Sequence, residues 1–75
     1  MIFNERLKML RGEKGLTQER AAQEMEMPLR SYHRLEADGS KTHYDTLLKI
    51  ADYYDVSVDW LMGRTDVREV NRGTS

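Results

Sequence analysis

Two arginines four residues apart, Arg30 and Arg34, are the side chains of this sequence best suited to recognising a nucleic acid. At that spacing they lie on one stripe of a helix. An arginine can donate two hydrogen bonds to O6 and N7 of guanine, and each such pair discriminates between bases by about 1–3 kcal/mol. Leu29 is suited to packing on a thymine methyl group, with Ser31 and His33 beside the arginines. These five residues are the predicted base contacts.

A second group of residues lies at the predicted starts of two helices, where a DNA phosphate is easily held. Free N–H groups and the positive end of the helix dipole make such a start favourable for an anion. One start follows a capping threonine, and the other follows a loop that contains a lysine. The predicted phosphate contacts are Thr17, Gln18, Lys41, Thr42, His43 and Tyr44.

Each of these residues also has a structural alternative. Arg34 could pair with the nearby carboxylate of Asp38, Gln18 could be an ordinary polar residue in a first helical turn, and Lys41 could be a solvated surface charge. Tyr32, between the two arginines, is predicted to face inward and pack in the core.

The elements that must position these side chains are all helical, because every strong apolar periodicity has spacing three and four. A first helix is predicted over residues 4–13, with Asn4 as its N-cap. Thr17 is predicted to cap a second helix, and Pro28 to lie in the first turn of a third. Thr42, with Asp45 three residues later, matches a capping box for a fourth helix.

The last predicted helix is short, is capped by Ser57 and ends at Gly63. With no strand-period segment in the sequence, the expected fold is all-α with five helices, the second and third forming a helix-turn-helix. The predicted domain covers residues 1–66, and residues 67–75 are expected to be a flexible polar tail.

The sequence resembles the Xre/Cro-type helix-turn-helix regulators, the lambda-repressor-like DNA-binding domains, over roughly residues 3–66. The matching segments are GLTQE at 15–19, Ala22, the turn around Met27, RLE at 34–36, TLLKIA at 46–51 and VSVDWLMGRTD at 56–66. The resemblance implies a five-helix lambda-repressor-like domain that reads DNA with its second and third helices. It also implies a structural ion pair between Arg11 and Glu36, and a phosphate contact by Gln18.

The sequence departs from the family pattern in three places. Glu26 stands in the inter-helix turn where the family has glycine, and a positive φ there costs on the order of 1 kcal/mol. The loop DGSKT at 38–42 replaces a more basic Gly-Lys-Arg-x-Pro segment. The predicted recognition helix carries only two arginines. The latter two departures lower the expected affinity for DNA.

Composition limits the remaining classes of function. The net charge is −1, whereas DNA-binding domains are often basic, so the distribution of charge must supply the attraction. The chain has no cysteine and two histidines without carboxylates at ligand spacing, so no metal or cofactor is expected. No nucleophile has a base partner, so no enzyme is expected. A soluble cytoplasmic protein is expected, because no segment resembles a membrane span or signal peptide.

The leading interpretation is a transcriptional regulator, specifically a repressor that binds a pseudo-palindromic operator as a homodimer. Tyr53, Trp60 and Met62 are the predicted dimer interface, although Trp60 could instead close the small core. A regulatory protein partner remains open, and no small-molecule substrate is evident. The alternatives are a protein-interaction module on the same fold, and an antitoxin or immunity repressor of a mobile element.

Overall fold

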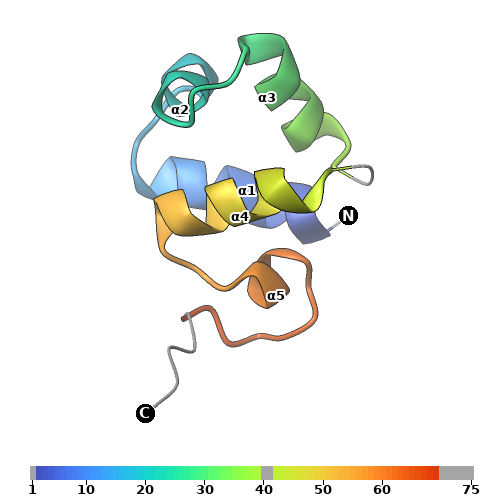
Figure 1. Ribbon diagram of the computed structural model, residues 1–75. Helices are drawn as coiled ribbons and strands as arrows, with labels where there is room; N and C mark the ends of the chain where they lie inside the picture. The colour runs from blue at the N-terminus through green and yellow to red at the C-terminus, as the bar shows by residue number, and fades with distance from the viewer. Residues whose placement is uncertain (1, 40–41, 70–75) are drawn as a thin grey trace.

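The computed structural model describes residues 2–39 and 42–69, and that part of the chain is entirely helical, with five helices and no strand (Figure 1). The helices are α1 (Ile2–Glu13), α2 (Gln18–Glu24), α3 (Leu29–Ala37), α4 (Tyr44–Tyr54) and α5 (Val58–Leu61). In Figure 1, α2 and α3 form one end of the molecule, α1 and α4 cross its middle, and α5 lies at the opposite end. The predicted all-α, five-helix fold is confirmed.

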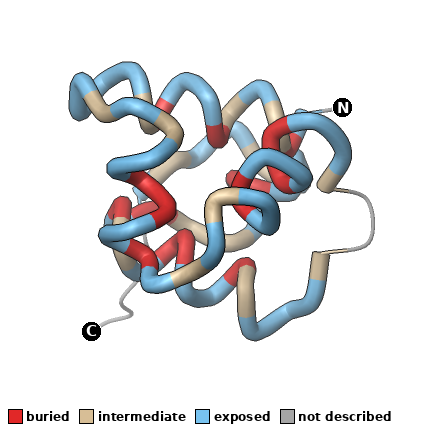
Figure 2. The backbone as a smooth tube through the Cα atoms, turned by 90° about the horizontal axis from the view of Figure 1, so that it is seen from above, coloured by how far each residue is buried: buried red, intermediate tan, exposed pale blue. Residues whose placement is uncertain are grey.

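Each helix buries one apolar face in a single core, so buried and exposed residues alternate along the tube in Figure 2. The side chains of Leu7, Leu10, Tyr32, Ile50 and Leu61 are fully buried. Ala21 and Ala22 are the buried residues of α2, which packs against α3, and their small side chains allow a close approach of neighbouring helices.

Two predicted helix starts are wrong, and both errors have the same cause. Asn4 lies inside α1, and its Nδ2 donates to the carbonyl of Ala37 at 3.1 Å. Thr42 does not cap α4: its hydroxyl donates to the carbonyl of Gly39 at 2.7 Å, and His43 is the N-cap without a side-chain hydrogen bond. In both cases the side chain predicted to cap a helix instead donates a hydrogen bond to a backbone carbonyl near the end of α3.

Two caps follow expectation, whereas Pro28 lies just before the first turn of α3 and not in it as predicted. The hydroxyl of Thr17 accepts a hydrogen bond from the backbone N–H of Arg20 at 3.0 Å, and that of Ser57 accepts one from Trp60 at 3.3 Å. Pro28 immediately precedes the first residue of α3 as its N-cap. Glu26, in the turn between α2 and α3, has a φ of 55° and is therefore in the left-handed region. This conformation is unfavourable for glutamate, whereas the glycine usual at this position would adopt it without strain.

The segment after α5 packs against the domain beyond residue 66. The backbone N–H of Ser57 donates to the carbonyl of Arg68 at 2.9 Å, and the Arg68 guanidinium forms a salt bridge with Glu13 at the end of α1. The structure therefore extends the packed domain to Arg68, two residues past the predicted boundary. Residues 70–75 of the predicted tail lie outside the described residues. None of the helices in the described part of the chain combines the length and apolar character needed to cross a bilayer.

Candidate nucleic-acid interface

The outer side of α3 carries four of the five predicted base contacts. Tyr32, Leu35 and Glu36 are buried and fix the rotation of the helix about its axis. The residues that this rotation exposes are Arg30, Ser31, His33 and Arg34. Leu29 is only partly exposed because it packs against the core, so it offers a smaller surface to a thymine methyl group.

Both arginines of α3 are exposed, and no salt bridge in the described part of the chain involves either of them. The alternative of an ion pair between Arg34 and Asp38 is therefore not adopted. Those two residues meet instead through the backbone, where the N–H of Asp38 donates to the carbonyl of Arg34 at 2.8 Å. The two positive charges remain available to an external acceptor.

A groove of about 510 Å³ runs between α3 and the start of α4. It brings together two groups that are separate in the sequence. Ser31 and Arg34 line it from α3, and Thr42 and His43 line it from the start of α4. Lys49, which was not among the predicted contacts, also lines the groove, one helical turn along α4 from Asp45. Two of the predicted base contacts and two of the predicted phosphate contacts thus line the same groove.

The predicted phosphate contacts lie in different environments. Tyr44 is 63% exposed at the first residue of α4, and His43 is exposed beside it. Thr17 accepts one hydrogen bond through its hydroxyl oxygen as the α2 cap, and its hydroxyl hydrogen remains a donor. Thr42 uses its hydroxyl hydrogen on Gly39. Lys41 lies outside the described residues.

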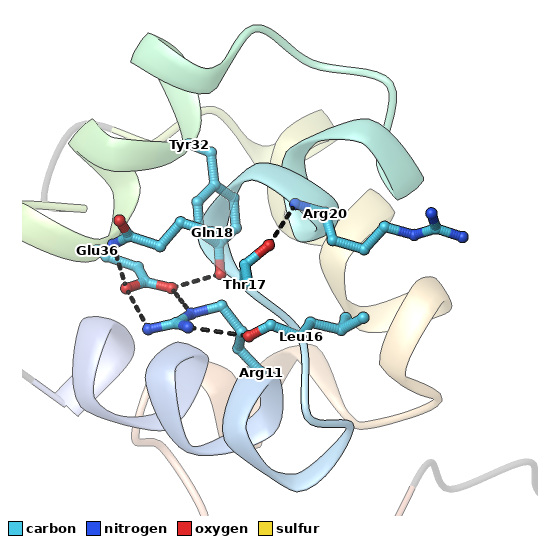
Figure 3. Close-up of polar contacts among 7 residues, drawn as sticks. All are labelled: Arg11, Leu16, Thr17, Gln18, Arg20, Tyr32 and Glu36. Atoms are coloured by element: carbon cyan, nitrogen blue, oxygen red, sulfur yellow. Dashed lines mark hydrogen bonds and ion pairs between the residues drawn. The ribbon is translucent and has the colours of Figure 1, made fainter.

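Gln18 is held by a buried carboxylate, an arrangement that sequence reasoning missed. Its Nε2 donates to Oε1 of Glu36 at 2.9 Å, so its side chain joins the end of α3 to the start of α2 (Figure 3). Two polar residues eighteen positions apart give no local pattern from which this hydrogen bond could be inferred.

Glu36 is the centre of the polar network in Figure 3 and is only 3% exposed. Its carboxylate accepts from Arg11 Nε at 2.7 Å and from Arg11 Nη2 at 3.3 Å, the ion pair that the resemblance implies. The Tyr32 hydroxyl donates to Oε2 of the same carboxylate, and Arg11 Nη1 also donates to the carbonyl of Leu16 at 3.0 Å. The Tyr32 bond has a sequence signal, since the two residues are four apart on one helix and a buried tyrosine hydroxyl needs a partner.

The electrostatics of this network favour a charged glutamate. Burial alone raises the pKa of Glu36, but hydrogen bonds from Arg11, Tyr32 and Gln18 outweigh it, so the pKa falls below its usual value. Burial and the hydrogen bond to Glu36 raise the pKa of Tyr32, which keeps its hydroxyl protonated as a donor. The carboxylate therefore acts as a fixed anionic acceptor inside the domain.

The three predicted dimer residues do not form one exposed surface. Trp60 is 5% exposed and belongs to the core, which is the alternative to a place in the dimer interface. The guanidinium carbons of Arg6 and Arg68 lie 4.6 and 5.3 Å from its ring centroid. Tyr53 is half-buried against Tyr54, with ring centroids 4.9 Å apart. Met62 is exposed and alone of the three offers substantial apolar surface.

Comparisons with known proteins agree on one motif. The helix-turn-helix family profile matches residues 7–61. The HTH-type transcriptional regulator ImmR of Bacillus subtilis (strain 168) is 35% identical over 71 residues, 95% of this chain and 56% of that protein. The uncharacterized HTH-type transcriptional regulator YobD of the same strain is 38% identical over 65 residues, 87% of this chain and 58% of its own.

A third relative, the uncharacterized HTH-type transcriptional regulator YqaE of Bacillus subtilis (strain 168), is 34% identical over 61 residues, 81% of this chain and 53% of that protein. The chain therefore spans a little more than half the length of these curated relatives. No solved structure matches it at a significant level.

Proposed function

The chain belongs to the helix-turn-helix family, and from that membership we propose that it is a sequence-specific DNA-binding transcriptional regulator whose α3 enters the major groove. The observation that carries the proposal is the exposed pair Arg30 and Arg34, which make no salt bridge in the described part of the chain, with Arg34 lining a groove shared with α4. The names of the relatives, HTH-type transcriptional regulators, favour the same role. This is a binding function and not catalysis.

Base readout is assigned to the exposed side of α3. Arg30 and Arg34 donate to guanine O6 and N7, with Ser31 and His33 beside them, and Leu29 adds a partial apolar contact at the start of the helix. The rigid packing of Tyr32 and Leu35 in the core supports this assignment, because it fixes the direction in which the arginines project.

Phosphate contacts are assigned to the two edges of this surface. Thr17 and Gln18 lie at one edge, and the start of α4 supplies the other. The start of α4 is favourable because the first N–H groups of a helix have no acceptor within it, and Tyr44 and Asp45 at the start of this eleven-residue helix are exposed. The residues assigned there are Lys41, Thr42, His43 and Tyr44.

The regulator acts as a cytoplasmic repressor, binding a pseudo-palindromic operator as a homodimer, with Met62 at the two-fold contact. The exposed Met62, 42% accessible at the end of α5, supports this arrangement. Measurement of the molar mass by light scattering for the wild type and for Met62→Lys tests it. A dimer that the substitution dissociates is expected, and a wild type that stays monomeric on its operator contradicts it.

The test of DNA reading is selection of bound sequences from a randomised duplex pool at two salt concentrations, with Arg30→Ala beside the wild type. Enrichment of an inverted repeat that Arg30→Ala loses is expected. Arg64→Ala is the matched control, because it removes the same charge shortly after α5, the helix at the opposite end of the molecule from α2 and α3 (Figure 1). Weak binding that neither salt nor Arg30→Ala changes would contradict DNA reading and favour a protein-interaction module.

A further inference from the structure

We propose that Glu36 and Tyr32 are positioning residues for DNA binding, which act by holding the Gln18 side chain in the one arrangement that presents its amide to a phosphate. The inference rests on the proposed function, since the phosphate belongs to DNA. It goes further by assigning a binding role to a buried network that would otherwise only hold α1, α2 and α3 together.

The first step is the completeness of the carboxylate's hydrogen bonding. Oε1 of Glu36 accepts from Gln18 Nε2 at 2.9 Å and from Arg11 Nη2 at 3.3 Å. Oε2 accepts from Arg11 Nε at 2.7 Å and from the Tyr32 hydroxyl. Each oxygen thus has two donors, and a buried network satisfied in this way is rigid. Rotation of the carboxylate would break several hydrogen bonds at once.

The second step concerns what remains free on Gln18. Its amide nitrogen carries two hydrogens, and one is used on Glu36. The second hydrogen is therefore fixed in direction, because the first is anchored to a buried acceptor. Gln18 is only partly buried, so this hydrogen belongs to a side chain at the border between the network and solvent.

The third step is the gain in affinity for DNA that comes from restricting the Gln18 side chain before it binds. A mobile glutamine loses rotamer freedom when it binds, and that loss weakens affinity. A glutamine already held by Glu36 avoids most of it. Tyr32 acts indirectly, because its hydroxyl donates to Oε2 of Glu36 and so restricts rotation of the carboxylate. The orientation of Oε1, which accepts from Gln18, is thereby fixed as well.

The chain offers a matched control for Tyr32. The hydroxyl of Tyr54 is also buried and lies close to that of Tyr32, but it donates no hydrogen bond to the Glu36 carboxylate. Tyr32→Phe and Tyr54→Phe thus remove the same atom from the same core, and only the first removes a donor to Glu36. Tyr54→Phe is expected to fold and to bind DNA like the wild type.

The experiment measures the affinity of each variant for a labelled mixed-sequence duplex of about 20 base pairs, long enough for two half-sites. The variants are Tyr32→Phe, Tyr54→Phe, Gln18→Ala and the double variant Tyr32→Phe with Gln18→Ala. Losing one hydrogen bond predicts an affinity about threefold to tenfold weaker for Tyr32→Phe and for Gln18→Ala. The double variant is expected to be no weaker than Gln18→Ala, because both changes remove one interaction.

A second measurement separates positioning from mere stability. The side-chain amide signals of Gln18 are assigned in an NMR spectrum as the pair missing from Gln18→Ala. In the wild type and in Tyr54→Phe they are expected to be displaced from free-glutamine positions, and in Tyr32→Phe or Glu36→Gln to move toward those positions. Wild-type signals already at the free-glutamine positions overturn the inference.

The affinities separate failure of this inference from failure of the proposed function. If the wild type binds the duplex and the effects of Tyr32→Phe and Gln18→Ala simply add, only the positioning role is wrong. If the wild type binds no duplex in a salt-dependent way, the proposed function fails and the positioning role fails with it.

Discussion

Glu36 is the buried charge on which this small domain depends, and its ionisation links stability to pH. Its pKa in the folded chain lies below the value of about 4.3 typical of an unfolded chain. Its contribution to stability is therefore fully present above that unfolded value and is lost as the pH falls through the lower, folded value. We predict that urea denaturation followed by circular dichroism at a series of pH values shows this loss in the acid range.

Glu36→Gln is expected to be less stable than the wild type at neutral pH by about 1–3 kcal/mol, because Arg11 loses its charged partner. Its acid loss is expected to be shallower, since one titrating group is gone. Glu5→Gln, which changes an exposed carboxylate on α1, is the control and should leave the acid profile as it is. Equal acid slopes for the wild type and Glu36→Gln would show that Glu36 does not carry the effect.

For individual residues, the sequence predicted which side chains of the candidate site are exposed better than it predicted their hydrogen-bond partners. The exposed side of α3 follows from helical periodicity, because the spacing that buries Tyr32 and Leu35 also exposes Arg30 and Arg34. The bond from Gln18 to Glu36 was not predictable, because it depends on how two helices pack and not on any spacing along one of them.

The turn between α2 and α3 carries an unfavourable residue, and replacing it should stabilise the domain. Glu26 has a φ of 55°, a conformation that costs an L residue about 1–2 kcal/mol. Glycine relieves that strain but has more freedom in the unfolded chain, so we predict that Glu26→Gly stabilises by about 0.5–1 kcal/mol in urea denaturation. Gln23→Gly, inside α2, is the control and should destabilise by about 1 kcal/mol. A less stable Glu26→Gly would contradict the strain argument.

Gly39, just after α3, packs against the first turn of α1. A Cβ at Gly39 would lie 2.2 and 2.3 Å from the ring of Phe3, which is buried. We therefore predict that Gly39→Ala destabilises by about 1–3 kcal/mol, as overpacking does, and weakens DNA binding by displacing the loop before α4.

Gly12→Ala is the matched control for Gly39→Ala. A Cβ at Gly12 meets nothing within 4 Å, and the residue lies inside α1, so alanine should stabilise by up to about 1 kcal/mol. Thermal unfolding of both variants measures the difference. A Gly39→Ala protein as stable as the wild type would show that Phe3 moves aside without cost.

At the scale of elements, all five helices were predictable from apolar periodicity, and two of their starts were not. Asn4 and Thr42 have the chemistry of caps, but each donates to a carbonyl near the end of α3. Local sequence shows what a side chain can accept or donate, whereas the competing partner comes from another helix. The cap at Thr17 was predictable because its geometry is local, whereas the turn at Glu26 was implied by the resemblance.

Across the whole molecule, the two ends have separate roles. The α2–α3 end carries the proposed DNA surface, and the opposite end is closed by α5 and the segment up to Arg68 (Figure 1). Trp60 joins that segment to α1, because the guanidinium groups of Arg6 and Arg68 both lie over its ring. The sequence indicated a flexible tail from residue 67 because polar composition does not reveal a salt bridge to a distant glutamate.

Removal of the Arg68 side chain should therefore open the α5 end without affecting the DNA surface. In Arg68→Ala, Trp60 loses one of its two cationic neighbours and Glu13 loses its partner, so the buried indole becomes accessible to water. Trp60 is the single tryptophan of the chain, so its fluorescence reports on this region alone. We predict emission at longer wavelength, stronger quenching by acrylamide and a slightly lower melting temperature, with unchanged affinity for a duplex that carries a single half-site and needs no dimer contact. Arg64→Ala removes an exposed arginine whose closest carboxylate, Asp59, is 4.0 Å away, and should change none of these signals. Unaltered Trp60 emission in Arg68→Ala would mean that α1 and α5 close the core by themselves, and weaker DNA binding would mean that the two ends are coupled through the core.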